Sequence, residues 1–287
     1  MLSYQHAWHA GNFADVHKHL VLFALTERLR QKRSAISFID THAGRGRYPL
    51  AEATTARLAE YRDGVLPLWE AYEADGAGEA TLTRFGEALA GAQTGRTLDC
   101  YPGSPWWLAR ALRPCDHLTL FELHPGEHRH LAGADLERVA SGSRRIHRQH
   151  SDGLAGLVRR LPVATPRLCV LIDPAWEVKR EYRDVAETLA ATVRKVRHAL
   201  VMIWYPLLPD GRHRVLLETI EGHGLRNVWR SEFVRYAPQR VRGLYGSGLL
   251  LLNPPWQLDV ELDSALAALA ALFGGDAAHK SDRWLPE

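Results

Sequence analysis

The chain has 287 residues, of which 46% are hydrophobic and 24% are charged, proportions that are ordinary for a globular protein. This length suits one large α/β domain, or one domain that carries an insertion. The formal net charge of +3 is mild, and three widely spaced cysteines provide neither a disulfide framework nor a CxxC metal pair. No stretch approaches the ~20 apolar residues of a membrane span, and the polar first residues lack the apolar core of a secretory signal. We therefore expect a cytoplasmic protein without a membrane partner.

The first half of the chain predicts a helix, a strand and a long insertion. Apolar residues recur at helical spacing from Phe13 to Leu29, and Asn12 suits the N-cap. A short strand at residues 36–39 then runs into a glycine-containing turn. About seventy residues separate this turn from the next strand, which is far more than an ordinary crossover needs. We predict one domain over residues 1–287, with residues 48–99 forming a small inserted helical subdomain.

The second half of the chain alternates strands with helices. Five strands are predicted, at residues 118–121, 168–172, 200–204, 228–234 and 249–252. Helical patterns at residues 182–196 and 215–221 lie between them, which is the βαβ rhythm of a parallel sheet. A helix at residues 263–273 and a loose polar tail are expected to close the chain. The sequence thus predicts an α/β fold.

The turn after the first strand, Asp40-Thr41-His42-Ala43-Gly44-Arg45-Gly46, lies where parallel strands form a ligand crevice. Small residues such as Gly44 let the backbone approach a ligand there. Pro49 occupies the place of the third glycine of a dinucleotide fingerprint, and no acid follows at the end of a strand about twenty residues on. A nicotinamide oxidoreductase is therefore disfavoured.

Three later segments could complete a site for a nucleoside with an amino-acid tail. Glu122 ends a predicted strand and could accept the two hydroxyls of a ribose, and Asp152 follows the next strand and could accept from an adenine amine. Ser104 suits the N-cap of a helix with Pro105 at its first position, and the free N–H groups there suit a carboxylate. Each of these features alone more often has a structural role. Their order along the chain, after successive strands, is what favours a cofactor site.

A buried strand at residues 168–172 delivers Asp173-Pro174-Ala175-Trp176. An adenine amine is a poor nucleophile, and a carboxylate and a carbonyl that accept its hydrogens can aim its lone pair at a methyl sulfonium. Pro174 fixes φ at one residue of this turn, and Trp176 offers a flat face for an extruded base. Asn253-Pro254-Pro255-Trp256 fits an amine-methyltransferase pattern better but follows the last predicted strand, so we expect a structural turn there that borders the site. Asp173 is the preferred catalytic residue.

Two further groups of side chains leave alternatives open. Five arginines, Arg226, Arg230, Arg235, Arg240 and Arg242, accompany a single acid, Glu232, and could neutralise phosphates or form a solvated face. His17 and His19 are two residues apart and do not share a helix face. Together with His6, His9 and His42 they show no recognised ligand spacing, so no metal site is expected.

Short motifs distributed along the chain resemble one known family. They are Met1–His6, His9–Asn12, Asp15, Lys18-His19, Asp40–Tyr48, Tyr101–Pro105, Glu122–Pro125, Trp204–Pro206, Ser247-Gly248 and Asn253–Trp256. Together they resemble the ribosomal RNA large subunit methyltransferase J family, over essentially the whole chain and in order. The resemblance implies a Rossmann-like class I fold and methyl transfer from S-adenosylmethionine to N6 of an adenine in 23S ribosomal RNA.

The resemblance also implies roles for individual residues. Asp173 would be the catalytic acceptor, and Tyr4, His6 and Lys18 would lie near the cofactor and the target base. The other cofactor contacts would be His19, His42, Ser104, Glu122, Asp152 and Gly153. The family typically has Asp-Pro-Pro-Tyr, whereas Ala175 here loosens the turn and Trp176 enlarges the stacking face.

Two alternatives remain open from the residues alone. A DNA adenine methyltransferase would use the same site chemistry, and a catalytically silent RNA-binding protein is conceivable because of Ala175. We expect a monomer that acts on protein-free 23S ribosomal RNA, before the subunit is fully assembled.

Overall fold

The structure is a computed structural model that describes residues 6–140 and 145–287, apart from the side chains of residues 6 and 54. Its centre is an eight-stranded sheet in the order β10-β8-β9-β7-β6-β1-β4-β5. The strands are β1 (Ile36–Asp40), β4 (His117–Phe121), β5 (Ile146–Gln149), β6 (Arg167–Ile172), β7 (Leu200–Leu207), β8 (Val228–Val234), β9 (Gly246–Leu252) and β10 (Ala278–Leu285). All the predicted strands are present, so the α/β fold is confirmed.

The sheet contains the parallel part that the βαβ pattern predicts, and also an antiparallel part that this pattern does not indicate. Strands β5, β4, β1, β6 and β7 pair in parallel, whereas β9 runs antiparallel to both β7 and β8. The reason is that β8 and β9 are joined by a short loop without a crossover helix, and such a connection produces an antiparallel pair. The tail is also not loose, because β10 pairs antiparallel with β8. Its polar composition hid this strand, since it lies at the sheet edge with half-exposed side chains.

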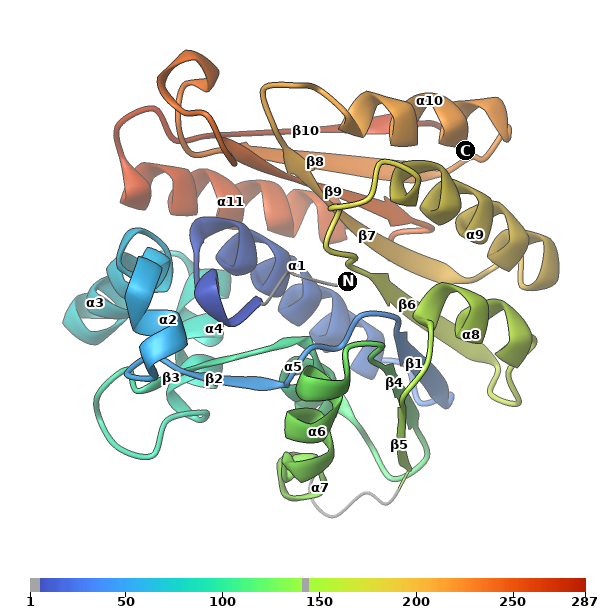
Figure 1. Cartoon of the computed structure of the whole chain (residues 1–287), viewed down its shortest axis with the longest axis horizontal. Helices are drawn as coiled ribbons and strands as arrows, with labels where there is room; N and C mark the ends of the chain where they lie inside the picture. Colours follow the sequence, from blue (N-terminus) through green and yellow to red (C-terminus); the bar gives the residue numbers. More distant parts are fainter. Residues whose placement is uncertain (1–5, 141–144) are drawn as a thin grey trace.

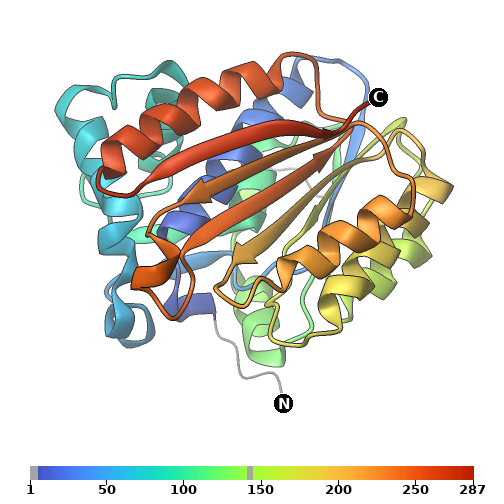
Figure 2. The same cartoon turned by 90° about the horizontal axis from the view of Figure 1, so that it is seen from above.

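Helices cover both faces of the sheet (Figures 1 and 2). One face carries α8 (Gly153–Arg160), α9 (Glu181–Lys195) and α10 (His213–Gly222), and the other carries α1 (Phe13–Arg30), α5 (Ser104–Ala111) and α11 (Leu258–Phe273). Two short helices, α6 (Pro125–Gly133) and α7 (Leu136–Val139), precede β5. The predicted C-terminal helix begins five residues earlier than expected, at Leu258. Each face of the sheet has its own cluster of buried apolar residues.

Helix α1 is buried along most of its length. The Asn12 side chain accepts from the Asp15 N–H, as expected for an N-cap, and every residue from Phe13 to Thr26 is buried. A helix that is buried on all sides packs among other elements on every face. Its polar residues Asp15, His17, Lys18 and His19 are consequently buried as well, and buried polar groups require partners.

The insertion lies between two short strands that pair with each other, β2 (Arg47–Pro49) and β3 (Cys100–Pro102). It contains α2 (Ala53–Leu58), the 3-10 turn η2 (Glu60–Asp63), α3 (Val65–Asp75) and α4 (Ala80–Ala90). The chain is interrupted on both sides of η2, between α2 and α3. Ala59 adopts a left-handed φ of 50°, and Gly64 approaches the backbone of Gly11 so closely that a Cβ there would collide.

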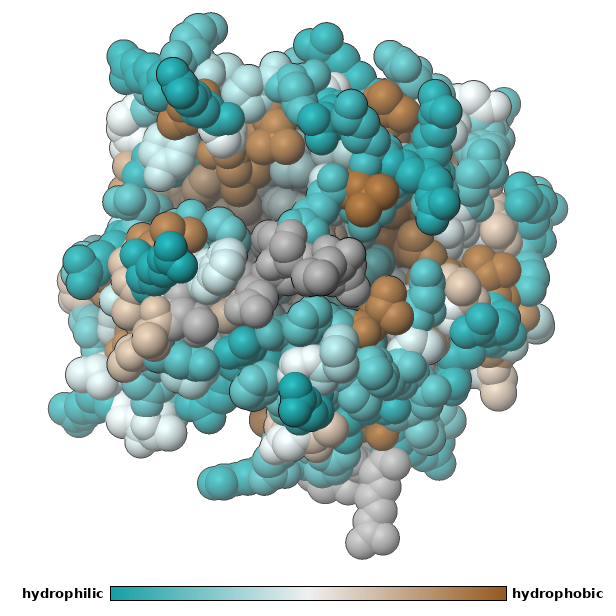
Figure 3. All heavy atoms as spheres, in the orientation of Figure 1, coloured by the Kyte–Doolittle hydropathy of each residue, from teal (hydrophilic) through white to brown (hydrophobic). Residues whose placement is uncertain are grey.

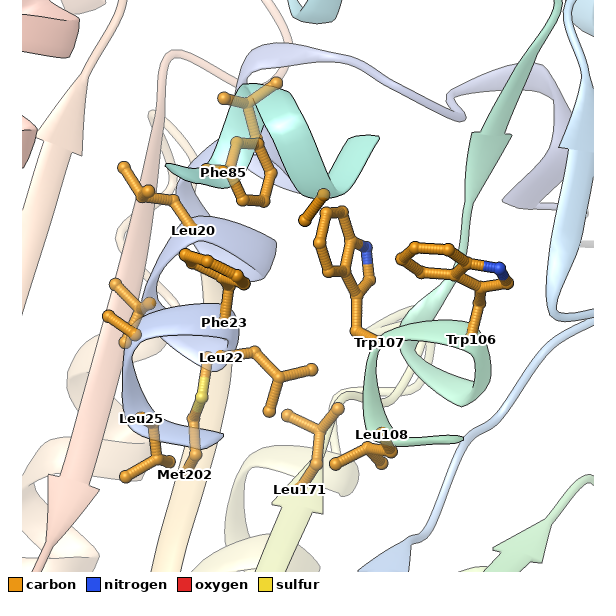
Figure 4. Packing of buried hydrophobic residues seen from close by; sticks show 14 of the residues in the cluster. Leu20, Leu22, Phe23, Leu25, Phe85, Trp106, Trp107, Leu108, Leu171 and Met202 are labelled. Atoms are coloured by element: carbon orange, nitrogen blue, oxygen red, sulfur yellow. The ribbon is translucent and has the colours of Figure 1, made fainter. Parts of the chain in front are cut away.

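The insertion shares its core with the sheet. Figure 4 shows Phe23 of α1, Phe85 of α4 and Trp107 of α5 converging. The Phe85 and Trp107 rings stack with centroids 4.7 Å apart, and the edge of Phe23 meets Phe85 at 5.7 Å. One apolar cluster contains residues of the insertion, of α1 and of the sheet, so the insertion packs as part of the same core.

This aromatic contact predicts a stability effect. Phe85→Ala should lower the free energy of unfolding by about 3–5 kcal/mol, since it removes a fully buried ring. Urea unfolding followed by circular dichroism measures the loss. The matched control is Leu58→Ala in the same insertion, where the side chain is exposed and the change should stay within about 0.5 kcal/mol. Equal effects of the two substitutions would contradict the shared core.

Candidate active site

The polar turns after four parallel strands meet at one edge of the sheet. Backbone hydrogen bonds tie these strand ends together: Thr41 N–H donates to Leu171 O at 3.1 Å, Ala43 N–H to Phe121 O at 2.9 Å, and Glu122 N–H to Gln149 O at 3.0 Å. Asp40 is the last residue of β1, Glu122 and Asp173 directly follow β4 and β6 at this edge, and Asp152 comes after β5. Ligands of α/β sheets bind at the carboxyl ends of strands, so the edge is the candidate site.

A buried ammonium group links this edge to helix α1. Lys18 Nζ lies 2.6 Å from Asp173 Oδ2 and 2.9 Å from Asp15 Oδ1. The other Asp15 oxygen accepts the Gly11 N–H at 2.9 Å. Burial alone would lower the pKa of Lys18, but the Asp15 and Asp173 carboxylates outweigh it and hold that pKa well above its ordinary value. Lys18 therefore stays protonated and fixes the position of Asp173.

Within the part of the chain that the structure describes, one oxygen of Asp173 has no hydrogen-bond donor. Among residues 6–140 and 145–287, no side chain or N–H group donates to Asp173 Oδ1. The Asp173 side chain is 12% exposed, so this oxygen lies in a confined space. A carboxylate oxygen in that position can accept a hydrogen from a bound amine.

The Trp176 side chain points away from the sheet edge. The residue adopts a left-handed φ of 58° and is only 4% exposed, and its ring centroid lies 4.6 Å from that of Tyr182 on α9. A base could stack on Trp176 only after this indole had left its pocket. The stacking role of Trp176 stays a prediction that depends on such a movement.

Glu122 closes the turn after β1. Its Oε2 accepts the Gly44 N–H at 2.8 Å and its Oε1 accepts the His124 N–H at 2.6 Å. Burial raises the pKa of Glu122, and the two N–H donors oppose that rise. Gly44 has a φ of 60°, and a Cβ at this position would come within 2.4 Å of Tyr48 Oη. The glycine is thus required by the local fold, and the carboxylate keeps lone pairs for further donors.

Asp40 and Ser104 form a buried pair beside this turn. Ser104 Oγ donates to Asp40 Oδ2 at 2.7 Å, and the His42 N–H donates to Asp40 Oδ1 at 3.1 Å. Burial raises the pKa of Asp40 to about 7 against these donors, and burial lowers the pKa of His42 to about 4. Ser104 is the first residue of α5 and Gly103 is the N-cap. The predicted N-cap was therefore one residue too late, because the Ser104 hydroxyl binds Asp40 instead of the helix.

His19 and Gly153 are both buried in the protein. His19 Nδ1 lies 2.9 Å from Tyr101 Oη, and its ring stacks on Trp107 with centroids 6.2 Å apart. A Cβ at Gly153 would come within 1.9 Å of Thr41 O, so α8 can approach the turn after β1 only with glycine there. Asp152, which is exposed, caps α8 by accepting the Ala155 N–H at 2.9 Å. Contact of these residues with a cofactor stays a prediction.

Three residues that the sequence assigned to the site or its border are not seen there. Tyr4 and the side chain of His6 fall outside the described residues. Asn253 lies at the opposite edge of the sheet, where its amide donates to Ala199 O at 2.9 Å and to Arg197 O at 3.2 Å. The expectation that Asn253 borders the site is therefore wrong. Its φ of 55° marks a structural turn at the far end of β9.

Sequence reasoning gave no role to two residues that the structure brings to the site. Asp15 was noted only within a family-like motif, although its spacing of three from Lys18 places both on one helix face. Trp204 of β7 was likewise noted only within such a motif, yet its ring centroid lies 5.7 Å from Lys18 Nζ. No local pattern signals the Trp204 contact, since α1 and β7 are far apart in sequence.

Comparison with known proteins identifies the family. The family model described as "Ribosomal RNA large subunit methyltransferase D, RlmJ" matches residues 33–286. The chain belongs to this family. It is 31% identical over 286 residues to ribosomal RNA large subunit methyltransferase J of Escherichia coli (strain K12), covering 99% of each chain. The corresponding protein of Haemophilus influenzae is 30% identical over 270 residues, covering 94% of this chain and 93% of that protein.

A solved structure supports the same assignment. The crystal structure of protein LPL1258 from Legionella pneumophila superposes with a TM-score of 0.87 at 29% identity, covering 96% of this chain and 98% of that one. The chain is therefore an RlmJ-family methyltransferase with a Rossmann-like class I fold, and its cofactor is S-adenosylmethionine. Within the described parts of the chain, no helix has both the length and the apolar character needed to cross a membrane.

The buried Asp40 predicts a pH-dependent stability. Its pKa is about 7 in the folded protein and about 3.9 in an unfolded chain. The folded state therefore holds this proton more tightly, and the stability that Asp40 contributes below about pH 4 is lost as the pH rises to about 7. The free energy of unfolding of the wild type minus that of Asp40→Asn should fall over this range, by at most about 1.4 kcal/mol per pH unit. Urea unfolding at several pH values measures the difference, and a rising difference would contradict the assignment.

Proposed function

We propose that this site transfers a methyl group from S-adenosylmethionine to N6 of an adenine in 23S ribosomal RNA. The observation that carries the proposal is the Asp173 carboxylate, which Lys18 holds through one oxygen at 2.6 Å while the other oxygen stays open among the described residues. This geometry suits a group that accepts hydrogen from an exocyclic amine. Family membership supports RNA over DNA as the substrate.

The chain's own residues activate and position the amine. When bound, the cofactor supplies an electrophilic methyl group on a sulfonium. Asp173 Oδ1 accepts one N6 hydrogen and the backbone carbonyl of Pro174 accepts the other, which directs the nitrogen lone pair away from the ring. In the transfer, the new N–C bond would replace the bond from the methyl group to sulfur, which would leave a neutral thioether, while the amine gives up one proton toward Asp173. Lys18 has a third N–H, which can donate to a ring nitrogen of the adenine.

The residues at the sheet edge fit a nucleoside with an amino-acid tail. The partly exposed Glu122 carboxylate can accept ribose hydroxyls in addition to its two backbone donors. Asp152, at the end of β5, can accept from the adenine amine of the cofactor. His42 and Gly44 belong to the turn after β1, Gly153 lies against Thr41 of that turn, and Ser104 binds Asp40 just before it. His19 binds Tyr101. We assign these residues to cofactor binding.

The arginines around β8 divide into two groups. Arg226 precedes β8 at the sheet edge opposite to the site, and Arg230 is paired with Asp282 at 2.8 Å. Arg235, Arg240 and Arg242 lie in the loop after β8, at the same edge as the site. This loop contacts the start of α1, because Tyr236 meets Phe13 with ring centroids 5.7 Å apart.

We assign this loop to phosphate contacts with the RNA. Arg240 and Arg242 are exposed, and only Arg240 has an acidic partner among the described residues, Asp276 at 2.9 Å. The face of the molecule shown in Figure 3 is largely hydrophilic, with apolar residues scattered over it. A polar face with a cationic loop suits a nucleic acid better than an apolar partner.

Three finer statements belong to the same proposal. The confined Asp173 requires an extruded base, so the enzyme acts on 23S ribosomal RNA before proteins fix that segment in the assembled subunit. An RNA substrate of this kind places the enzyme in the cytoplasm. One chain supplies the whole assigned site, so we propose that the active form is a monomer.

Replacement of the acceptor tests the proposed chemistry. Asp173→Asn should lower methyl transfer to protein-free 23S ribosomal RNA by about a hundredfold or more, since the neutral amide is a much weaker acceptor. Incorporation of labelled methyl from S-adenosylmethionine measures the rate, and nucleoside analysis should find N6-methyladenosine. Assembled large subunits and duplex DNA are the parallel substrates. Label in DNA only, or an unchanged rate in Asp173→Asn, would refute the proposal.

The arginine loop makes a second prediction. Replacing both Arg240 and Arg242 by Gln should weaken RNA binding and reduce the steepness of its dependence on salt, because fewer phosphates are neutralised. Filter binding of 23S ribosomal RNA at several salt concentrations measures both quantities. Arg226→Gln is the matched control at the opposite edge and should leave them unchanged. Equal effects of the two replacements would show that the loop has no special role.

A further inference from the structure

The register of the sheet places one tryptophan beside Asp173. Ile172 of β6 pairs with Ile203 of β7 in parallel, so the next residues along the two strands, Asp173 and Trp204, emerge side by side. Trp204 is partly exposed, and Lys18 Nζ lies 5.7 Å from its ring centroid, near the outer limit of a cation–π contact. The indole, the ammonium group and the carboxylate therefore occupy the same corner of the site.

Hydrogen bonds hold the Trp204 indole in a fixed orientation. Its Nε1–H donates to Ser247 Oγ at 2.9 Å, and Ser247 Oγ lies 2.9 Å from His17 Nδ1. His17 Nε2 lies 3.0 Å from Ser231 Oγ, and these three partners are fully buried. Burial also lowers the pKa of His17 well below its ordinary value, so the imidazole is neutral and can both donate and accept. The ring cannot turn without breaking this chain of contacts.

The other tryptophan next to Asp173 lacks these properties. Trp176 is 4% exposed, its ring packs on Tyr182, and its Nε1 has no partner among the described residues. Trp204 instead has a partly exposed ring, a satisfied N–H and a charged neighbour that contacts the proposed acceptor. In this conformation, Trp204 is the tryptophan beside Asp173 that a base can reach.

We propose that Trp204 provides the aromatic face on which the target adenine stacks, with its N6 directed at Asp173. The proposal rests on the proposed function and names the residue that places the base. Stacking on an aromatic side chain depends on the π face and tolerates any base, so Trp204 positions the base while Asp173 and Lys18 contact its polar edge. The pre-oriented ring lets the base bind without reordering the indole.

A kinetic series tests this role. Trp204→Leu should lower kcat/KM for protein-free 23S ribosomal RNA by about tenfold or more, while Trp204→Phe, which keeps an aromatic face, should lose much less. Trp256→Leu removes an exposed tryptophan at the far end of β9 and is the control expected to leave the kinetics unchanged. Calorimetric titration should give the same affinity for S-adenosylmethionine in all variants. Equal kcat/KM in Trp204→Leu and the wild type would overturn the proposal.

A binding measurement that does not require methyl transfer tests the stacking role of Trp204 separately from the proposed function. The fluorescence of 2-aminopurine riboside 5′-monophosphate should be quenched on titration with the wild-type protein, and the quenching should be lost in Trp204→Leu but kept in Trp256→Leu. Quenching that needs Trp204 in a protein that does not methylate RNA would refute the proposed function and leave the stacking face intact. Quenching that persists in Trp204→Leu would refute the stacking face.

If Trp204→Leu fails to fold, Ser247→Ala provides a second variant that tests the same role of Trp204. This change removes the hydrogen bond that orients the indole and leaves the ring in place. We expect a KM for RNA several-fold above the wild-type value, with an unchanged kcat and an unchanged cofactor affinity. An unchanged KM for RNA in folded Ser247→Ala would overturn the proposal.

Discussion

The ammonium group of Lys18 is nearly inaccessible to solvent, and two carboxylates from distant parts of the chain hold it. Removing one partner from a buried ion pair leaves an uncompensated charge, which is strongly destabilising. Asp15 comes from the same helix as Lys18, and Asp173 directly follows β6, so the pair joins helix α1 to the turn after β6. The position of the proposed acceptor thus depends on the position of α1. Much of the fold around the site can be understood as a means of placing this helix.

Helix α1 is buried on every side because elements from several parts of the chain surround it. The insertion contributes Phe85, which packs between Phe23 and Trp107, and β9 contributes Ser247, which contacts His17. The insertion therefore supports the site from a distance. It does so through apolar packing, while the sheet does so through hydrogen bonds to buried polar side chains.

The chain contains two similar tetrapeptides that end in tryptophan, at residues 173–176 and 253–256, and their places in the sheet distinguish them. Asn253-Pro254-Pro255-Trp256 resembles an amine-methyltransferase motif more closely, yet its asparagine satisfies backbone carbonyls at the edge opposite to Glu122 and Asp173. Strand β9 runs antiparallel to β7, so its carboxyl end cannot reach the site edge. Asp173-Pro174-Ala175-Trp176 follows a parallel strand next to β1. The direction of the strand, which no tetrapeptide encodes, separates the two.

The sequence by itself determined the α/β class, the helix from Phe13, most strand positions and the family, because these depend on local periodicity and on motifs in order. It also indicated Asp173 and Glu122, since both follow apolar runs that form parallel strands. Tertiary structure alone decided that β9 is antiparallel, that the polar tail is a strand, and that Trp176 is buried whereas Trp204 lies beside Asp173. These features depend on pairings between residues that are far apart in the chain, such as Ile172 with Ile203. Contacts and ion pairs between residues so far apart in the chain produce no periodic pattern in the sequence.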